Sequence, residues 1–330
     1  MSTAARPGSA GTANRVLVAV GGNATHPENI TGTTEEQEVV AAAAARALLP
    51  LMQMDTQLVV THGNGPVVGK ILLRQILTRD KVAPMRLDIC VAHSQGGIAY
   101  LLMQAMENEL RSAGTERIVA CVLTQVEVDR DDPAFGNPSK PIGPFFKEDD
   151  ARALVAQGWN MMEDAGRGWR YAVASPRPHG VVNLSLIDTM AQMGTIVIAG
   201  GGGGIPVVRD ADGRLHGVEA VIDKDLTSAF MANLLGIETL MILTSVPRVA
   251  IDFGKPGQRE LGTVSVGDLE AYQAEGHFAR GSMAPKIDAV LRFLAHGGRR
   301  AIIAHLDQAG AAFRGEAGTH IVAERITDCI

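Results

Sequence analysis

The chain has 330 residues, enough for one large domain or two ordinary ones. Apolar residues make up 46% of it and charged residues 20%, which is typical of a globular protein with a sizeable core. The net charge of −6 excludes a basic field for nucleic acid, and three widely spaced cysteines exclude a disulfide framework.

Residues 1–14 lack the apolar core of a signal peptide, and we expect them to be disordered. No apolar run reaches the length of a membrane span, so we expect a cytoplasmic protein with no membrane partner. Beyond this segment, short apolar runs alternate with longer amphipathic ones. The expected strands are 15–20, 57–62, 117–125, 195–200, 239–246 and 300–305, and the expected helices are 34–52, 66–78, 88–112, 184–193, 225–235, 265–275 and 283–296.

This alternation predicts an open, mainly parallel sheet with helices on both faces. One stretch, from Val128 to about Ala174, breaks the rhythm because it is polar and rich in Pro and Asp. A loop of that length inside a compact domain is usually functional or an inserted subdomain. We expect a small lobe that projects from the sheet edge, and the alternative is a solvated insertion without a role.

Three of the expected strands end in glycine clusters. The first ends in Gly21, Gly22 and Asn23, the second in Gly63, Asn64 and Gly65, and a third cluster runs over 200–204 with Gly202 and Gly203 inside it. In a parallel sheet these ends meet at the carboxyl edge, where backbone N–H groups at helix starts bind anions. The three clusters together predict a phosphate-sized anion site, although each alone is also typical of a tight turn. Neither a Walker A motif nor a GxGxxG fingerprint is present.

Phosphoryl transfer needs positive charge around the moving group. Lys140 in SKPIGPF, Lys224 in VIDKD and Lys286 in GSMAPK lie in loops or at a helix start, where they could reach the glycine ends. The alternative for each is an ordinary surface lysine. Asp223 and Asp225 flank Lys224, and we expect Asp225 both to hold this lysine and to cap the following helix.

Two other kinds of site are disfavoured. The histidines are scattered without HxxxH or HExxH spacing, so we expect no metal held by protein side chains. The HSQGG stretch around Ser94 has Ala92 where a nucleophile elbow needs glycine, and it lies in an expected helix. A serine hydrolase is therefore disfavoured.

Several longer stretches carry a family resemblance. From about Arg15 to Val322 the chain resembles the carbamate kinases of the amino-acid kinase family. The stretches that carry this resemblance are VGGNA, VTHGNGPVVG, TQVEVDRDDPAFGNPSKPIGPFF, GGGGIPVV, VEAVIDKDL, FGKPGQRELG, GHFARGSM and AGTHI.

The resemblance implies a three-layer α/β/α sandwich and a homodimer that transfers a phosphoryl group between ATP and carbamate. The products are ADP and carbamoyl phosphate, Mg²⁺ bridges the nucleotide phosphates, and the usual setting is arginine breakdown. It also implies one domain over 15–330. An acceptor-substrate lobe of about 15–210 would contain the projecting subdomain of about 128–174, and a nucleotide lobe would follow from about 211 to 330.

The resemblance also implies roles for single residues. Lys140 would reach the carbamate end from the projecting lobe, Lys224 would neutralise the phosphoryl oxygens, and Asp225 would orient Lys224. Phosphate or substrate would be bound by Gly21, Gly22, Asn23, Gly63, Asn64, Gly65, Gly202 and Gly203, and the nucleotide by Thr244, Ser245, Met283 and Lys286.

The chain also departs from the family pattern. The loop LTSVPRVAID has Ser245, Pro247 and Ala250 where the family has a more acidic sequence, and Ala284 replaces a glycine. His93 and Asn183 stand where the family usually has Met and Glu. These departures leave two alternatives open: a family kinase that acts on another small carboxylate or phosphonate, or a weakly active nucleotide-binding relative.

Overall fold

The computed structural model describes residues 14–22, 26–27, 30–164, 166–279 and 281–323. The expected disordered segment therefore lies outside the described residues, except for Asn14, which begins the first strand. Within the described ranges, no helix has both the length and the apolar character needed to cross a bilayer.

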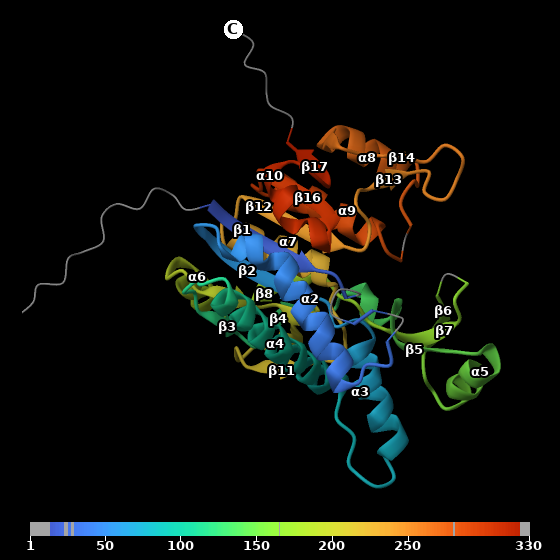
Figure 1. Ribbon diagram of the computed structural model, residues 1–330. Helices are drawn as coiled ribbons and strands as arrows, with labels where there is room; N and C mark the ends of the chain where they lie inside the picture. The colour runs from blue at the N-terminus through green and yellow to red at the C-terminus, as the bar shows by residue number, and fades with distance from the viewer. Residues whose placement is uncertain (1–13, 23–25, 28–29, 165, 280, 324–330) are drawn as a thin grey trace, which may run out of the picture.

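An eight-stranded sheet forms the middle of the molecule (Figure 1). Its strand order is β15-β17-β16-β12-β1-β2-β9-β3, and every neighbouring pair is parallel except β16 and β17. The expected mainly parallel sheet is thus confirmed. The strands are β1 (Asn14–Val20), β2 (Thr56–His62), β3 (Val119–Cys121), β9 (Ile196–Ile198), β12 (Thr239–Thr244), β15 (Thr263–Ser265), β16 (Arg300–His305) and β17 (Thr319–Val322).

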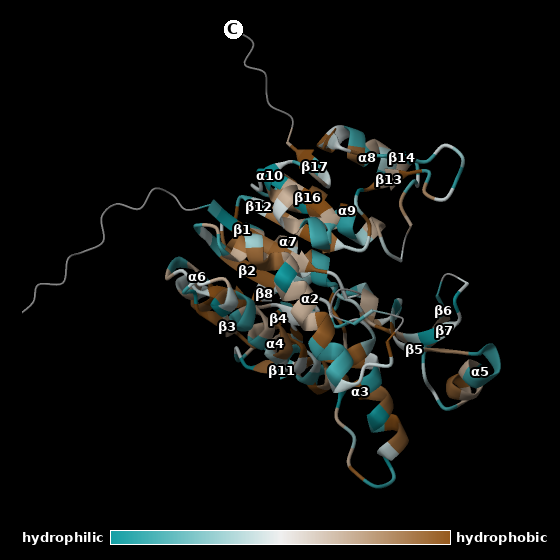
Figure 2. Ribbon diagram, in the orientation of Figure 1, coloured by the Kyte–Doolittle hydropathy of each residue, from teal (hydrophilic) through white to brown (hydrophobic). Residues whose placement is uncertain are grey.

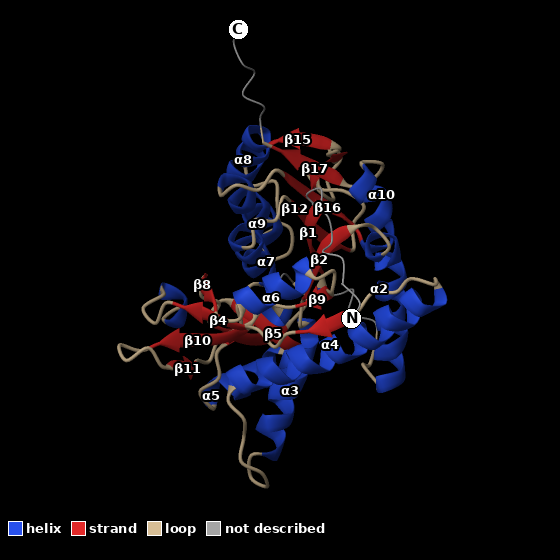
Figure 3. Ribbon diagram, turned by 90° about the vertical axis from the view of Figure 1, so that its left-hand side faces the viewer, coloured by secondary structure: helices blue, strands red, loops and turns tan. Residues whose placement is uncertain are grey.

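Helices cover both faces of this sheet, because successive side chains of a strand point to opposite faces. In β1, Val16, Val18 and Val20 pack into one apolar core, whereas Leu17 and Ala19 pack into the other. Figure 3 shows the helices on the two sides of the strands, and Figure 2 shows mostly apolar strands between helices of mixed hydropathy. The first core is covered by α2 (Thr34–Met52), α4 (Leu87–Ser112) and α10 (Ala309–Arg314), and the second by α6 (Leu184–Gln192), α7 (Lys224–Leu234), α8 (Val266–Ala274) and α9 (Ala284–Ala295).

This arrangement is the three-layer α/β/α sandwich that the resemblance implied. Each expected helix begins and ends within one residue of a helix in the structure. The short helix α10 was not predicted. The connecting elements that the sequence did not predict separately are β13 (Ala250–Ile251), β14 (Arg259–Glu260) and the 3₁₀ turns η1 (Pro133–Phe135), η2 (Gly201–Gly203) and η3 (Leu306–Gln308).

The expected strand 117–125 is wrong, because the chain divides it between two sheets. β3 ends at Cys121, and β4 begins at Gln125 in a separate four-stranded sheet of order β11-β10-β4-β8. Thr124 lies at the break: its N–H donates to the Gln95 side chain and its hydroxyl donates to the Val122 carbonyl. This second sheet contains β4 (Gln125–Val128), β8 (Pro178–Val181), β10 (Ile205–Arg209) and β11 (Leu215–Gly217).

The polar stretch 128–174, called the subdomain below, contains a separate sheet and a helix over residues 140–173, which lie to one side of the main sheet in Figure 1. Its three strands have the order β5-β7-β6 and are antiparallel. Tyr171 lies at its centre, with the rings of Phe146 and Trp159 edge-on at 5.3 and 5.5 Å. The elements are β5 (Lys140–Phe146), α5 (Glu148–Ala156), β6 (Met161–Glu163) and β7 (Trp169–Val173), and α3 (Gly65–Thr78) packs against β5 from the body.

Candidate functional site

Four strands of the main sheet end side by side at one edge. β12, β1, β2 and β9 are neighbours in that order and run parallel. The loops that follow them begin at Ser245, Gly21, Gly63 and Ala199. The glycine clusters predicted from the sequence therefore do meet at the carboxyl edge, where parallel sheets bind ligands.

The glycines are required because these loops are in close contact. A Cβ on Gly63 would lie 2.8 Å from the Gly22 backbone. A Cβ on Gly202, which has a φ of +65°, would lie 2.5 Å from Nδ2 of Asn64. Any side chain at either position would force the loops apart.

The backbone N–H groups at these strand ends have two different roles. The N–H of Gly21 donates to the Leu243 carbonyl at 2.9 Å, and that of Gly63 donates to the Val20 carbonyl at 3.0 Å. These two groups extend the hydrogen bonding between strands. The N–H groups of Asn64 and Gly65, at the start of α3, donate to no acceptor in the described part of the chain. A helix start with such orphan donors is suited to binding an anion.

The predicted lysines converge on a cleft of about 560 Å³ beside these loops. Lys140 comes from the subdomain, Lys224 from the first residue of α7, and Lys286 from the first turn of α9. Of the predicted phosphate or substrate residues, this cleft is lined by Gly22, Gly63, Asn64, Gly65 and Gly202.

A second cleft, of about 570 Å³, adjoins the first. Gly22, Arg170 and Lys286 line both. The predicted nucleotide residues Thr244, Ser245 and Met283, together with Gly21, line the second cleft. Gly203 is buried behind the first cleft against Ile222, and Asn23 lies outside the described residues.

Two carboxylates hold the three lysines in place. Asp225 pairs with Lys224 through one carboxylate oxygen and with Lys286 at 3.3 Å through the other. Asp223 pairs with Lys140 at 2.8 Å. Its other oxygen accepts the N–H groups of Asp225 and Leu226, at 2.9 and 3.3 Å. The expectation that Asp225 caps α7 is therefore wrong: Asp223 is the cap, because it stands at the position before the first helical turn.

Burial and charge act in opposite directions on these groups. Burial lowers the pKa of Lys224, and the adjacent Asp225 carboxylate opposes that effect. Burial alone would raise the pKa of Asp223 and Asp225, but the neighbouring lysines outweigh it and hold both pKa values below the usual range. Both carboxylates are therefore ionised at neutral pH.

The cleft also contains residues that sequence reasoning missed. Arg170 of β7 and Lys70 of α3 line it, which gives five cationic side chains against two carboxylates. The Lys70 ammonium group contacts Nε2 of His26 at 2.9 Å. Lys70 lies four residues after Pro66, so helical periodicity could have placed it on the cleft face of α3. The resulting excess of three positive charges focuses anions in a protein that is acidic overall.

Buried polar groups support the glycine loops from behind. The Gln95 amide donates to the Gly201 carbonyl at 2.8 Å and accepts the Thr124 N–H at 2.6 Å. The Thr124 hydroxyl in turn accepts the Gly200 N–H at 2.9 Å. This chain of bonds fixes the loop after β9 to α4.

Two further facts bear on the chemistry of the site. Among the described residues, no three His, Cys, Asp or Glu side chains gather as ligands for a metal ion. His62 is completely buried at the end of β2, and its burial lowers the pKa to about 4. This imidazole is therefore neutral at physiological pH.

Comparisons with known proteins agree with this geometry. A sequence model of the amino acid kinase family matches residues 14–305. A carbamate kinase from Thermococcus kodakarensis is 46% identical over 314 residues, which is 94% of this chain and 99% of that protein. A carbamate kinase from Giardia lamblia, solved with citric acid, superposes with a TM-score of 0.90 at 37% identity, covering 95% of this chain and 99% of that one. The same enzyme solved with AMP-PNP gives a TM-score of 0.87 at 37% identity and the same coverage.

Proposed function

This chain belongs to the amino acid kinase family, and on that premise we propose that it has carbamate kinase activity. It would transfer a phosphoryl group reversibly from ATP to carbamate, which gives ADP and carbamoyl phosphate. The observation that carries this proposal is the convergence of Lys140, Lys224 and Lys286 on one cleft beside the start of α3.

The chemistry needs no general base, because carbamate is already an anion. Catalysis then consists of aligning the two substrates and neutralising the charge that spreads over the phosphoryl oxygens. The cleft supplies suitable groups: an excess of positive charge and the N–H groups of Asn64 and Gly65. The neutral, buried His62 has no part in the transfer.

The positions of the lysines support separate roles. Lys140 is the only one of the three on the subdomain, and we assign it to the carbamate end. Lys224 lies at the start of α7, fixed by Asp225, and we assign it to the transferring phosphoryl group. Lys286 lines both clefts, so we assign it to the phosphates that join nucleotide and acceptor. Gly22, Gly63 and Gly202 keep the floor of the cleft free of side chains.

The adjoining cleft would bind the nucleotide. Thr244, Ser245 and Met283 line it. The similarity to a structure solved with AMP-PNP supports this assignment. Of the departures in the 244–250 loop, Ser245 bears on this cleft because it is one of its walls, whereas Pro247 is not among the lining residues. Nucleotide affinity is therefore the property that we expect this departure to change most.

We propose that Mg²⁺ accompanies the nucleotide and is bound by phosphate oxygens. The two carboxylates that line the first cleft, Asp223 and Asp225, are both paired with lysines, and the nucleotide cleft is lined by a further carboxylate, Asp307. Neither Asp223 nor Asp225 is therefore a spare ligand for the ion.

Two of the departures from the family pattern, His93 and Asn183, lie outside the clefts and leave the acceptor site unchanged, which favours carbamate over another acceptor. His93 lies on the exposed side of α4, and Asn183 lies at the start of α6; neither is among the residues that line the two clefts. We further propose a cytoplasmic homodimer that serves arginine breakdown, with its lobes divided near residue 210. The β10–β11 hairpin spans that division.

The test is a coupled assay for ATP formation from ADP and carbamoyl phosphate, run with the Lys224→Ala variant as control. We expect ATP formation that the variant loses by about 10²- to 10³-fold, as for other lost electrostatic donors. Equal rates in the two proteins would refute the proposal. In the ATP-consuming direction, a panel of small carboxylates and phosphonates should show a clear preference for carbamate.

A further inference from the structure

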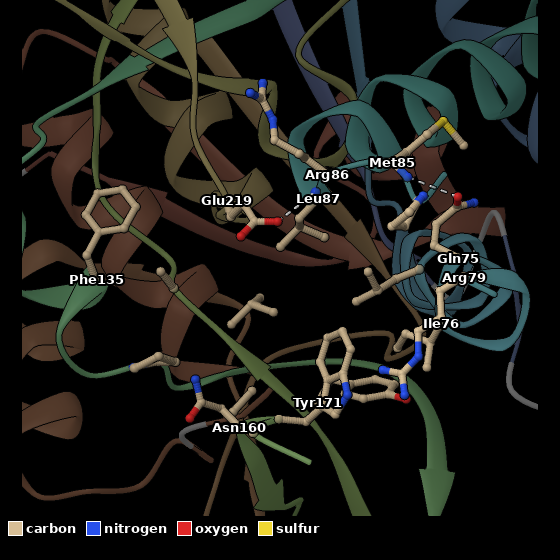
Figure 4. Close-up of a pocket in the computed structure, with 18 residues that line it drawn as sticks. Gln75, Ile76, Arg79, Met85, Arg86, Leu87, Phe135, Asn160, Tyr171 and Glu219 are labelled. Carbon is tan, nitrogen blue, oxygen red and sulfur yellow. Dashed lines mark hydrogen bonds between the residues drawn. The ribbon is translucent and has the colours of Figure 1, made fainter. Parts of the chain in front are cut away.

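A third cavity, of about 610 Å³, lies away from the two clefts and has no assigned role. Figure 4 shows it between the end of α3, the loop that leads into α4, and the subdomain. Phe135 and Arg79 lie on opposite sides of it in this view. Among the described residues, it shares no lining residue with either cleft. Its volume is in the usual range for a small-molecule site.

The walls of the cavity are apolar and aromatic. Ile76 of α3, Leu87 of α4 and three rings of the subdomain, Phe135, Trp159 and Tyr171, contribute to them. Such a surface favours a flat apolar ring over a polar or strongly hydrated ligand.

The polar groups around it differ in whether they are already paired. Arg86 makes a bidentate pair with Asp88, and Glu219 accepts the Leu87 N–H at 3.3 Å. The Arg79 guanidinium, by contrast, makes no ion pair or hydrogen bond with any residue that the structure describes. Glu219 likewise makes no ion pair with any described residue, so the cavity has one unpaired charge of each sign. The unpaired cation, the exposed Arg79, is the group that matches a carboxylate.

Tyr171 adds a second unsatisfied group. Its side chain is buried, and its hydroxyl has no hydrogen-bond partner among the described residues. An unpaired buried hydroxyl costs about 1–3 kcal/mol. A ligand oxygen nearby would recover part of that cost.

We propose that this cavity binds a small aromatic monocarboxylate, with the ring between Phe135 and Trp159 and the carboxylate on Arg79. The site goes beyond carbamate kinase activity, and binding to it does not depend on that activity.

The cavity is connected to the reaction cleft through the subdomain sheet. On β7, Arg170 lines the reaction cleft and the next residue, Tyr171, lines the cavity, because successive strand residues face opposite sides. β5 pairs with β7 through Lys140 with Val173 and Ile142 with Tyr171. A ligand that presses on Tyr171 and Val173 therefore acts on the strand that carries Lys140. As a regulatory effect, which rests on the proposed function, we expect a changed KM for carbamoyl phosphate.

Binding can be measured with Trp159 as the reporter. The chain has two tryptophans, so Trp169→Phe leaves Trp159, which lines the cavity, as the sole indole. Phenylacetate is the probe, and 2-phenylethanol and 2-phenylethylamine are its neutral and cationic counterparts. We expect saturable quenching by phenylacetate, about tenfold weaker for the neutral compound, since a charge-assisted contact contributes roughly that factor.

Two variants test the assignment to Arg79. Arg79→Ala should weaken phenylacetate binding about tenfold, whereas Lys81→Ala, which removes the same charge two residues further on, should not. Ile76→Phe fills the cavity and should abolish binding while the Lys81→Ala protein still binds. Equal affinity for all three compounds, or equal affinity in Arg79→Ala and Lys81→Ala, would overturn the proposal. So would an absence of saturable quenching.

The regulatory effect is measured separately. Saturating phenylacetate should shift the KM for carbamoyl phosphate in the wild-type chain and not in Arg79→Ala. Binding without a KM shift would overturn regulation and leave the site standing. If the chain had no kinase activity, the fluorescence result would still decide whether the site exists.

Discussion

The Lys140 ammonium group lies 2.8 Å from a carboxylate oxygen of Asp223, and this ion pair joins the projecting subdomain to the start of α7. The same carboxylate caps α7, whose first residue is Lys224. One side chain thus positions a lysine of the subdomain and the helix that carries a lysine of the body. Asp225 then fixes the Lys224 ammonium group itself, so the distance between these two cations depends on both aspartates.

Replacing Lys140 by Met should lower kcat by about 10²- to 10³-fold, because a charge aimed at the reacting groups is lost. The melting temperature should fall as well, because the largely buried Asp223 carboxylate loses its lysine partner. Steady-state kinetics and thermal unfolding measure the two effects. Lys147→Met, on the exposed side of the same subdomain, is the matched control, and an equal loss in both variants would contradict the role of Lys140.

Gly63→Ala should abolish most turnover, because its Cβ would lie 2.8 Å from the Gly22 backbone and push two strand-end loops apart. Gly65→Ala should have a milder effect: its φ of +34° is unfavourable for alanine, but the nearest atom is 3.5 Å away. Gly97→Ala, in open space on α4, is the control and should stabilise the fold by about 1 kcal/mol. Normal turnover in Gly63→Ala would remove the steric argument.

Gln95→Leu should lower kcat by at least tenfold and leave the nucleotide KM nearly unchanged. Gln95 acts as a positioning residue, because its amide joins Gly201 and Thr124 behind the reaction cleft and does not line the nucleotide cleft. The split between kcat and KM distinguishes positioning from general loss of structure. Gln104→Leu, on the exposed side of the same helix, should change neither quantity.

His62 predicts a specific dependence of stability on pH. Burial lowers its pKa from 6.5 to about 4, so between these values the unfolded chain binds a proton here and the folded chain does not. Above pH 6.5 this residue does not reduce the free energy of unfolding. As the pH drops toward 4, the free energy of unfolding decreases by about 3 kcal/mol in total because of this residue.

Urea unfolding at several pH values measures the free energy of unfolding of the wild type and of His62→Gln. The difference between the two proteins at each pH is the contribution of His62. Other histidines and carboxylates contribute equally to both proteins and cancel. Parallel stability curves between pH 6.5 and 4 would show that His62 does not contribute.

The sequence predicted the parts of the site that depend on local pattern. Buried parallel strands must end at one edge, so the strand pattern alone places Gly21, Gly63 and the 200–204 cluster together. Lys140 and Lys224 were candidates because they lie in loops or at a helix start, where they could reach the glycine ends. The helices were predicted within one residue because their apolar periodicity and their flanking turns agree.

The rest depends on long-range contacts that no local pattern encodes. Arg170 reaches the cleft because β7 pairs with β5, which packs against α3 of the body, and nothing in GRGWRYAV indicates that placement. The cap of α7 was assigned to the wrong aspartate because both Asp223 and Asp225 fit the preference for an acidic residue at a helix start. At the break, the Thr124 N–H donates to the Gln95 side chain, which is 29 positions away in the chain.

The two adjoining clefts share Gly22, Arg170 and Lys286 as common walls. A molecule long enough to pass these three residues would therefore reach both clefts. A nucleoside polyphosphate joined to a small carboxylate would lose its rigid-body freedom once rather than twice, and the second group would bind at a high effective concentration. The shared lining residues make this protein suited to inhibition by such linked compounds. The length of the tether between nucleotide and carboxylate would be set by the distance between Ser245 and Lys140.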